Sequence, residues 1–189
     1  MAISVEKAKV SIDLTERFLR GAAVYDGELL HVRRDVVSLP NGREAAREYI
    51  RHPGAVAIIP LFEDGRILLE RQYRYPLGRE FIEIPAGKID PGEAQLETAR
   101  RELLEETGYA AEQWTRLGTI HVAISYTDEG IDIFLARGLI LRETKRDEEE
   151  FLETFKLPFP QALEMVHDGR ITDAKSVAGL FWLQAYLEK

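Results

Sequence analysis

Three glutamates, Glu102, Glu105 and Glu106, lie in one short stretch at spacings that suit a helix. Residues three or four apart on an α-helix share a face, so Glu102 falls beside both of the others. Carboxylate oxygens converging from one face are the ligands that hard cations such as Mg²⁺ or Mn²⁺ require. A glutamate-rich helix can equally be a solvated acidic surface. The cluster therefore indicates either a divalent-metal site or an exposed charged face.

The helix that would carry these glutamates has start and stop signals. Asp90 suits the N-cap, Pro91 suits the first helical position, and Glu93 would complete a capping box. Gly108 suits the left-handed position just past a helix end. These signals predict a helix of about four turns that begins at Asp90. The Pro-Ala-Gly turn before it, at residues 85–87, can bring backbone carbonyls to the same place.

Residues 87–109 match one long motif at every prescribed position. The motif reads Gly, five residues, Glu, seven residues, Arg-Glu, hydrophobic, any, Glu-Glu, any, Gly, hydrophobic. The residues that fill it are Gly87, Glu93, Arg101, Glu102, Leu103, Glu105, Glu106, Gly108 and Tyr109. A match of this length is far more specific than a lone glycine-rich triplet. The stretch is the Nudix box, and the chain resembles the Nudix hydrolase family.

This resemblance implies a loop–helix–loop metal site that hydrolyses a nucleoside diphosphate linked to another moiety. The implied cofactor is Mg²⁺, with Mn²⁺ as a substitute. Carried over by position, Glu102 and Glu106 resemble the principal metal ligands, and Glu105 assists them in catalysis. The carbonyl of Ala86 resembles the backbone ligand found before the box. Arg101 resembles the catalytic-site arginine that orients the glutamates.

The run from Arg71 to Gly87 is similar to the ADP-ribose pyrophosphatase branch of the family. Arg71 and Arg74 lie on an expected strand and could hold a diphosphate through charge-assisted, often bidentate, hydrogen bonds. Arg79 is an additional candidate for substrate binding, and Glu83 could contact ribose hydroxyls or metal-bound water. The alternative is that the arginines only solvate an edge strand.

Metal-assisted hydrolysis also needs a water activated for attack on phosphorus. Members of the branch place a glutamate for this in a mobile loop, and the matching loop, Ser125–Gly130, offers Glu129 with Asp128 as the rival. A carboxylate within hydrogen-bond reach of the water can act as general base. The branch usually shows Ser-Pro-Gly before this glutamate, whereas residues 123–125 read Ala-Ile-Ser. Relatives that accept GDP-mannose or other nucleotide sugars therefore remain alternatives.

The elements around the box predict an α+β fold, a mixed β-sheet with helices on its faces. This is the α/β/α sandwich that the Nudix resemblance implies. The apolar run Ala55–Leu61 is typical of a central strand, and residues 66–74 are expected to return as its paired strand. Further strands are expected at 81–84, 114–122 and 130–137, and helices near 160–167 and over 173–187.

The first fifty-two residues are rich in strand signals separated by Asp26-Gly27 and Asn41-Gly42 turns, which predicts a small antiparallel sheet. Such a sheet cannot bury both faces alone, so it must pack on the rest of the chain or on a second copy. In the branch that the chain resembles, this sheet belongs to a dimer interface and helps build the partner's nucleoside site. We therefore expect a homodimer. Residues 1–52 would form the dimerisation and substrate-site lobe, and residues 53–189 the Nudix hydrolase domain.

Composition excludes several other classes of protein. The 189 residues are 45% hydrophobic, as in ordinary globular proteins. The net charge of −8 argues against a nucleic-acid partner, because phosphate backbones are held by basic surfaces. No apolar run is long enough to span a membrane, and residues 1–10 do not read as a signal peptide. The chain has no cysteine for disulfides or thiolate chemistry, so we expect a cytoplasmic protein. We expect the acidic run Asp147–Glu150 to be solvated surface.

The leading hypothesis is Mg²⁺-dependent hydrolysis of ADP-ribose, a nucleoside diphosphate sugar, to AMP and ribose 5-phosphate. A broader hydrolase that accepts GDP-mannose is the first alternative. The second is the clean-up of modified nucleoside triphosphates, although such proteins tend to lack an N-terminal sheet. The third is a nucleotide-sugar sensor without catalysis, although such proteins typically lose box carboxylates that this chain retains.

Overall fold

A computed structural model describes residues 12–142 and 151–189 of the chain. The expectations for residues 1–10 and for Asp147–Glu150 fall outside these described residues. The chain divides into two compact units. The first is Met1–His52 with Ser125–Asp128, and the second is Pro53–Ile124 with Glu129–Lys189. Each unit has its own β-sheet structure.

The first unit is an antiparallel sheet of three strands in the order β1-β2-β3. The strands are β1 (Arg17–Asp26), β2 (His31–Ser38) and β3 (Glu44–Arg51). Both predicted turns join them. The N–H of Gly27 donates to the carbonyl of Leu30 at 2.9 Å, and Gly42 takes a positive φ of 80°, which glycine adopts without strain. The expected small antiparallel sheet is confirmed.

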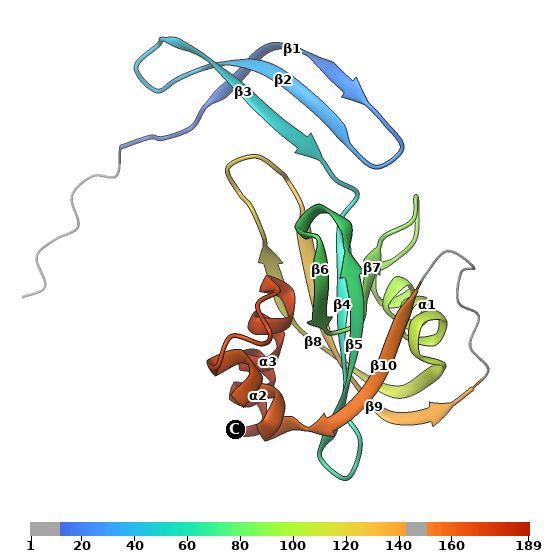
Figure 1. Ribbon diagram of the computed structural model, residues 1–189. Coiled ribbons are helices and arrows are strands. Elements are labelled where there is room, and N and C mark those ends of the chain that lie inside the picture. The colour runs from blue at the N-terminus through green and yellow to red at the C-terminus, as the bar shows by residue number, and fades with distance from the viewer. Residues whose placement is uncertain (1–11, 143–150) are drawn as a thin grey trace, which may run out of the picture. The chain divides into compact units, whose positions relative to one another are not determined.

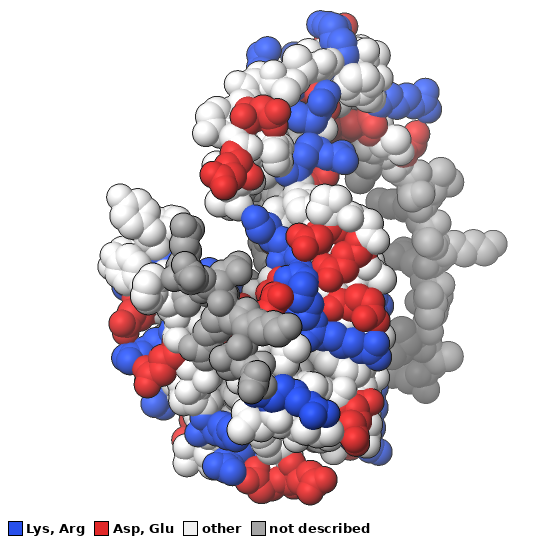
Figure 2. Space-filling view, turned by 90° about the vertical axis from the view of Figure 1, so that its right-hand side faces the viewer, with Lys and Arg blue, Asp and Glu red and all other residues white. Residues whose placement is uncertain are grey.

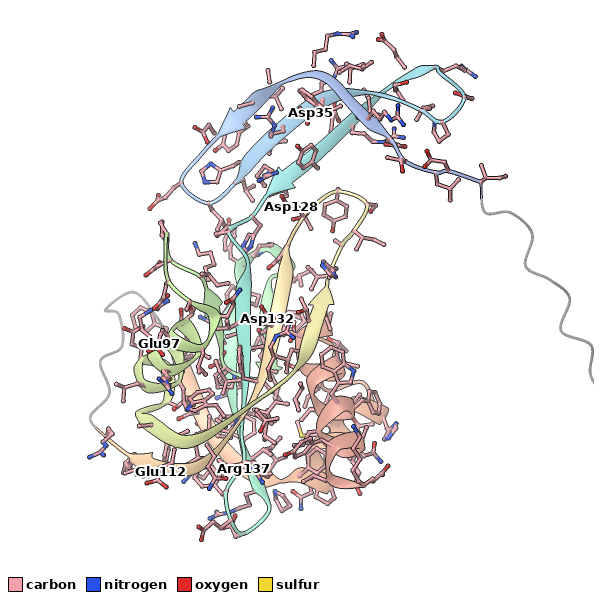
Figure 3. The ribbon with its side chains drawn as sticks, turned by 180° about the vertical axis from the view of Figure 1, so that it is seen from behind. Asp35, Glu97, Glu112, Asp128, Asp132 and Arg137 are labelled. Carbon is pink, nitrogen blue, oxygen red and sulfur yellow. The ribbon has the colours of Figure 1, made fainter. Side chains whose placement is uncertain are left out.

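A loop from far along the sequence completes this unit. The segment Ser125–Asp128 lies against the end of β3, where the N–H of Ile50 donates to the carbonyl of Tyr126 at 2.8 Å. The Asp128 carboxylate accepts the N–H of His52 at 2.8 Å. Asp128 is therefore held by the backbone of the N-terminal unit (Figure 3).

The second unit holds two sheets between helices (Figure 1). The first sheet runs β7 (Ala86–Lys88), β4 (Ala55–Pro60), β9 (Gly130–Leu141), β8 (Tyr109–His121). The second runs β10 (Leu152–Pro158), β5 (Arg66–Arg74), β6 (Arg79–Glu83). Helix α1 (Gln95–Thr107) covers one side, and α2 (Phe159–His167) and α3 (Ala174–Leu187) cover the other. Because β4 and β9 are parallel while the other paired strands are antiparallel, the predicted α+β mixed-sheet fold is confirmed.

Strand β4 lies at the centre of this unit, and all six of its residues are buried, as predicted. Successive side chains of a strand point to opposite faces. Ala57 and Ile59 accordingly join the core under α2 and α3, while Val56 and Ile58 pack with Leu103 of α1. Both layers of helices are thus anchored on one strand. Among the described residues, no helix is long and apolar enough to cross a membrane.

The helix that carries the glutamates begins later than predicted, at Gln95 rather than at Asp90. Asp90 to Glu93 form a turn instead, in which the N–H of Glu93 donates to the carbonyl of Asp90 at 3.0 Å. Gly92 there has a φ of 81°, which an α-helix cannot accommodate. The predicted end is confirmed, because Gly108 is left-handed, with a φ of 73°.

The predicted pairing of residues 66–74 with the central strand is wrong. Strand β5 pairs with β6 and with β10, and only an isolated bridge between Leu61 and Ile67 links it to the end of β4. The physical reason is burial. Ile67 to Glu70 are all buried, so β5 is itself the middle strand of a second sheet, and β10, which the sequence did not predict, supplies its other neighbour.

Candidate active site

Helix α1 brings two of its glutamates to the start of β7. Leu103 is buried in the core and fixes the rotation of the helix, which directs Glu102 and Glu106 toward residues 86–87. The Glu106 carboxylate is buried and accepts the N–H of Ala86 at 3.1 Å. This bond ties the C-terminal half of α1 to the turn that precedes the box.

Gly87 makes room for the other glutamate. A Cβ added at Gly87 would lie 1.9 Å from Cδ and Oε1 of Glu102, closer than any real contact between such atoms. The glycine therefore forms a cradle for the Glu102 carboxylate. The fixed glycine of the motif has a direct steric explanation, because every other residue would expel Glu102 from this position.

Arg101 connects the remaining carboxylates of the box. Its guanidinium donates to both oxygens of Glu93 at 3.1 and 2.9 Å, to Glu102 at 2.8 Å, to Glu105 at 3.1 Å and to the carbonyl of Lys88 at 3.2 Å. The hydrogen bonds that Glu93 accepts, first from Arg101 and then from the Thr98 hydroxyl and the Asp90 N–H, outweigh its desolvation and lower the pKa of Glu93 to about 2. The hydrogen bond with Glu93 raises the pKa of Arg101. Arg101 thus holds the turn before α1 and offsets the repulsion among the glutamates.

The donor set suits a hard divalent cation. Carboxylate oxygens of Glu102 and Glu106 approach residues 86–87, and the carbonyl of Ala86 adds a backbone oxygen of the kind that Mg²⁺ accepts. Among the described residues, no three acidic or histidine side chains already converge closely enough to hold a metal ion. Glu102 and Glu105 instead contact Arg101. A bound cation would therefore share these two carboxylates with the guanidinium.

A cavity of about 430 Å³ opens beside the first residues of the box. Residues 86–88 form one wall of it. The other walls include Arg74, Glu83, Glu129 and Lys175. All of these residues belong to the second unit. The cavity thus joins strand β7, which carries the Ala86 carbonyl and is approached by Glu102 and Glu106 of α1, to two cationic side chains and a candidate base.

Arg74 and Glu83 form a closed ion pair in the wall of this cavity. Nε and Nη2 of Arg74 donate to the two oxygens of Glu83 at 2.7 and 2.8 Å. Burial raises the pKa of Glu83, but the hydrogen bonds from Arg74 and the positive charge of Lys175 lower it further, so the net shift is downward. Both residues were predicted to contact substrate, and the structure brings them together.

Lys175 is a site residue that the sequence analysis missed. Its ammonium group is buried and donates to Glu83 and, at 3.0 Å, to Asp173. The available signal was electrostatic. A lysine in the first turn of a helix opposes the positive end of the helix dipole, so its presence two residues after the N-cap Asp173 calls for a partner.

Arg79 lies at the rim of the same cavity. Its guanidinium stacks over the Phe81 ring, 4.4 Å from the centroid, and its Nη2 is 3.5 Å from the hydroxyl oxygen of Thr172. Phe81 and Thr172 both line the cavity. Arg79 is thus held close to where a substrate would enter, by an aromatic face as well as by a hydroxyl.

Arg71 is placed apart from the other predicted substrate residues. It pairs with Glu80 at 3.3 Å and with Glu153 at 2.5 Å, and its position in β5 puts it on the opposite face from Arg74. Figure 2 shows that basic and acidic side chains are likewise interspersed over the face in that view. Within this chain, Arg71 is bound to surface carboxylates.

The two candidates for general base have different surroundings. Glu129 lines the cavity, half-buried, immediately before β9. Asp128 accepts the His52 N–H and pairs with Arg51 at 3.0 Å within the N-terminal unit. Of the two carboxylates, that of Glu129 is the one in contact with the cavity.

Comparisons with known proteins point to one family. A model of the NUDIX domain matches residues 51–180. The chain is 38% identical over 173 residues to an ADP-ribose pyrophosphatase of Bacillus subtilis (strain 168), covering 90% of this chain and 94% of that protein. It is 39% identical over 171 residues to a methanol dehydrogenase activator of Bacillus methanolicus, covering 89% and 92%. The solved structure of an ADP compounds hydrolase matches with a TM-score of 0.83 at 26% identity, covering 95% of this chain and 97% of that one. The chain belongs to the Nudix hydrolase family.

Proposed function

We propose that this enzyme hydrolyses the pyrophosphate bond of ADP-ribose to AMP and ribose 5-phosphate with the help of Mg²⁺. One observation carries the proposal. The cavity is bounded on one side by residues 86–88, where the Glu102 carboxylate rests on Gly87, and on another by the cations Arg74 and Lys175. An anionic diphosphate would fit between a metal and the guanidinium of Arg74, while the Lys175 ammonium is bound to Glu83 and Asp173. The similarity to an ADP-ribose pyrophosphatase and to an ADP compounds hydrolase favours an adenine nucleotide.

Glu102, Glu106 and the Ala86 carbonyl would hold the cation, and Glu105 would assist them. When bound, Mg²⁺ neutralises charge on the diphosphate and polarises its oxygens. Glu129, in the cavity wall, would accept the proton of the attacking water. Arg101, which donates to Glu102 and to Glu105, would hold these two carboxylates beside each other.

Two of the four proposed substrate residues, Arg74 and Glu83, line this cavity, and Arg79 contacts Phe81 and Thr172, which also line it. Arg74 and Glu83 would face the diphosphate and the adjoining ribose from the wall, and Arg79 would meet the substrate at the rim. Arg71 would serve only if substrate or a second copy of the chain displaced Glu80 and Glu153. Replacement of each arginine by lysine, which removes the planar fork, would rank their contributions to KM.

We also propose that the enzyme is a homodimer assembled through its N-terminal unit. All ten residues of β1 are exposed within this chain, and they include Phe18, Val24 and Tyr25 at 62%, 57% and 59% exposure. Exposed apolar surface of this kind marks interaction sites. A second copy would cover it, whereas a monomeric mass in light scattering at assay concentration would contradict the proposal.

The decisive experiment is a substrate panel with the purified enzyme. ADP-ribose, GDP-mannose and a modified nucleoside triphosphate are each incubated with and without Mg²⁺, and the products are separated by chromatography. We expect AMP and ribose 5-phosphate from ADP-ribose, in the presence of metal, at the highest kcat/KM of the panel. A preference for GDP-mannose would overturn the substrate assignment and leave pyrophosphate hydrolysis intact. Inactivity on the whole panel would favour the sensor alternative.

A further inference from the structure

We propose that Lys175, in the first turn of α3, is a positioning residue for substrate binding. It holds the Glu83 carboxylate, and Glu83 in turn fixes the guanidinium of Arg74 in the cavity wall. The inference rests on the proposed function for the identity of the substrate. It gives the C-terminal helix, far from the Nudix box in sequence, a direct part in the site.

The geometry forms one continuous chain of charges. The Asp173 carboxylate caps α3 by accepting the N–H of Ser176 at 3.0 Å, and it also accepts a hydrogen bond from Lys175 at 3.0 Å. Lys175 donates to the same Glu83 oxygen that accepts Nη2 of Arg74. Two acids and two cations therefore alternate from the helix end to the cavity.

Burying these charged side chains costs free energy unless each of them has a partner of opposite charge. The Glu83 side chain is 3% exposed and that of Lys175 is 10% exposed. Removing one partner of a buried ion pair leaves an uncompensated charge, whereas removing both can be neutral. A lysine at this place, where burial and the helix dipole both disfavour a cation, is therefore explained by the carboxylate that it faces.

A second buried acid increases the negative charge that Lys175 balances. Glu70 of β5 is fully buried and lies directly opposite Glu83 in the β5–β6 register. Without Lys175, Arg74 would face these two carboxylates without the second cation that donates to Glu83. The wall would then present excess negative charge to an anionic diphosphate and would draw Arg74 away from it. The expected defect is therefore in substrate affinity, because the glutamates of α1 are untouched.

The test compares Lys175→Met with Lys175→Arg and with Ser176→Ala. We expect Lys175→Met to raise the KM for ADP-ribose at least about tenfold, with kcat changed less than about threefold, which corresponds to about 1.4 kcal/mol of lost binding. Lys175→Arg keeps the charge and should recover most of the affinity. Ser176→Ala removes the hydroxyl that donates to the Asp173 carboxylate and accepts the N–H of Ile84. It removes no charged side chain, so it should lower the melting temperature without changing KM.

A double-mutant cycle with Glu83→Gln decides how Lys175 acts. Because the double variant removes both buried charges, it should fold even if Lys175→Met alone does not. Adding Lys175→Met to Glu83→Gln should change KM less than about twofold, since the carboxylate through which Lys175 acts is already neutral. Calorimetric Kd values for ADP-ribose give the same comparison without turnover.

Three results would overturn this inference: an unchanged KM in Lys175→Met, full additivity in the cycle, or a KM rise in Ser176→Ala equal to that of Lys175→Met. An unmutated enzyme that binds ADP-ribose but does not hydrolyse it would refute the proposed function alone. In that case the Kd values still decide the role of Lys175. An enzyme that neither binds nor hydrolyses any nucleotide sugar would refute both proposals.

Discussion

The carboxylate of Glu102 occupies the space that a side chain at Gly87 would need, with 1.9 Å between its Cδ and the position of the missing Cβ. We predict that Gly87→Ala displaces Glu102 and lowers kcat about 100-fold, the loss typical of a misplaced catalytic group. The assay is hydrolysis of ADP-ribose at saturating metal. Gly65→Ala is the control. Unlike Gly87, Gly65 sits at a positive φ, 79°, and its added methyl group meets nothing within 4 Å, so the substitution should cost stability through backbone strain and spare activity.

Glu106→Gln should abolish turnover and keep the fold. The amide retains an oxygen that can accept the Ala86 N–H, but it removes a charged metal ligand. We expect kcat to fall by more than about 100-fold, beyond the loss usual for groups that only orient a ligand. Glu97→Gln on the same helix is the control, because the Glu97 side chain is exposed and pairs with Arg100 (Figure 3). Normal activity in Glu106→Gln would remove Glu106 from the metal site.

Mg²⁺ should raise the melting temperature of the unmutated protein. A ligand that binds only the folded chain stabilises it by about 2.7 kcal/mol at one hundred times its Kd. The cation also relieves repulsion among the box carboxylates. Differential scanning fluorimetry with and without millimolar metal measures the shift, which Glu106→Gln should reduce. An identical melting curve with and without metal would mean that the cluster is surface charge.

Glu129→Gln and Asp128→Asn should separate the two candidate bases. A general base contributes about 100-fold or more to kcat, so we expect a loss of that size in Glu129→Gln. Asp128→Asn should keep kcat close to that of the unmutated enzyme, because Asp128 is engaged with His52 and Arg51. The reverse pattern would make Asp128 the base.

The Glu93–Arg101 pair should make stability depend on acid. The pKa of Glu93 falls from 4.5 to about 2 in the folded protein. A carboxyl whose pKa is lower in the folded state stabilises the fold fully above its unfolded value and loses this contribution as pH falls through the folded value. The free energy of unfolding should therefore decrease from pH 4.5 toward about 2. In urea titrations Glu93→Gln should flatten this dependence, and Glu97→Gln should leave it unchanged.

Local backbone chemistry explains most of what the sequence predicted correctly. Gly108 ends α1 as predicted, and the helix expected over 173–187 forms as α3, because each signal depends on a few adjacent residues. The burial of β4 follows in the same way from its unbroken apolar run. Strand pairing is different. Strands β5 and β10 pair although they are far apart in the sequence, and the residues of neither strand indicate which strand it will pair with.

The candidate site shows the same division. The Nudix box predicted the glutamates as a set, since one helix presents them together. Lys175 was missed because its partner Glu83 is 92 positions away in the sequence. A single lysine gives no indication that a distant carboxylate will lie beside it. The separation of Arg71 from Arg74 was accessible from the sequence. Residues three apart on a strand face opposite ways, so this alternation alone separates the pair.

Strand β5 has a consequence for how the family can diversify. Its alternate positions commit Arg74 to the cavity and Arg71 to the carboxylates of the other face. Substitution changes one side chain at a time, but insertion or deletion of one residue would reverse every assignment beyond it. Evolution should therefore vary the residues of this strand far more freely than its length, and new specificities should arise in the segments on either side of it.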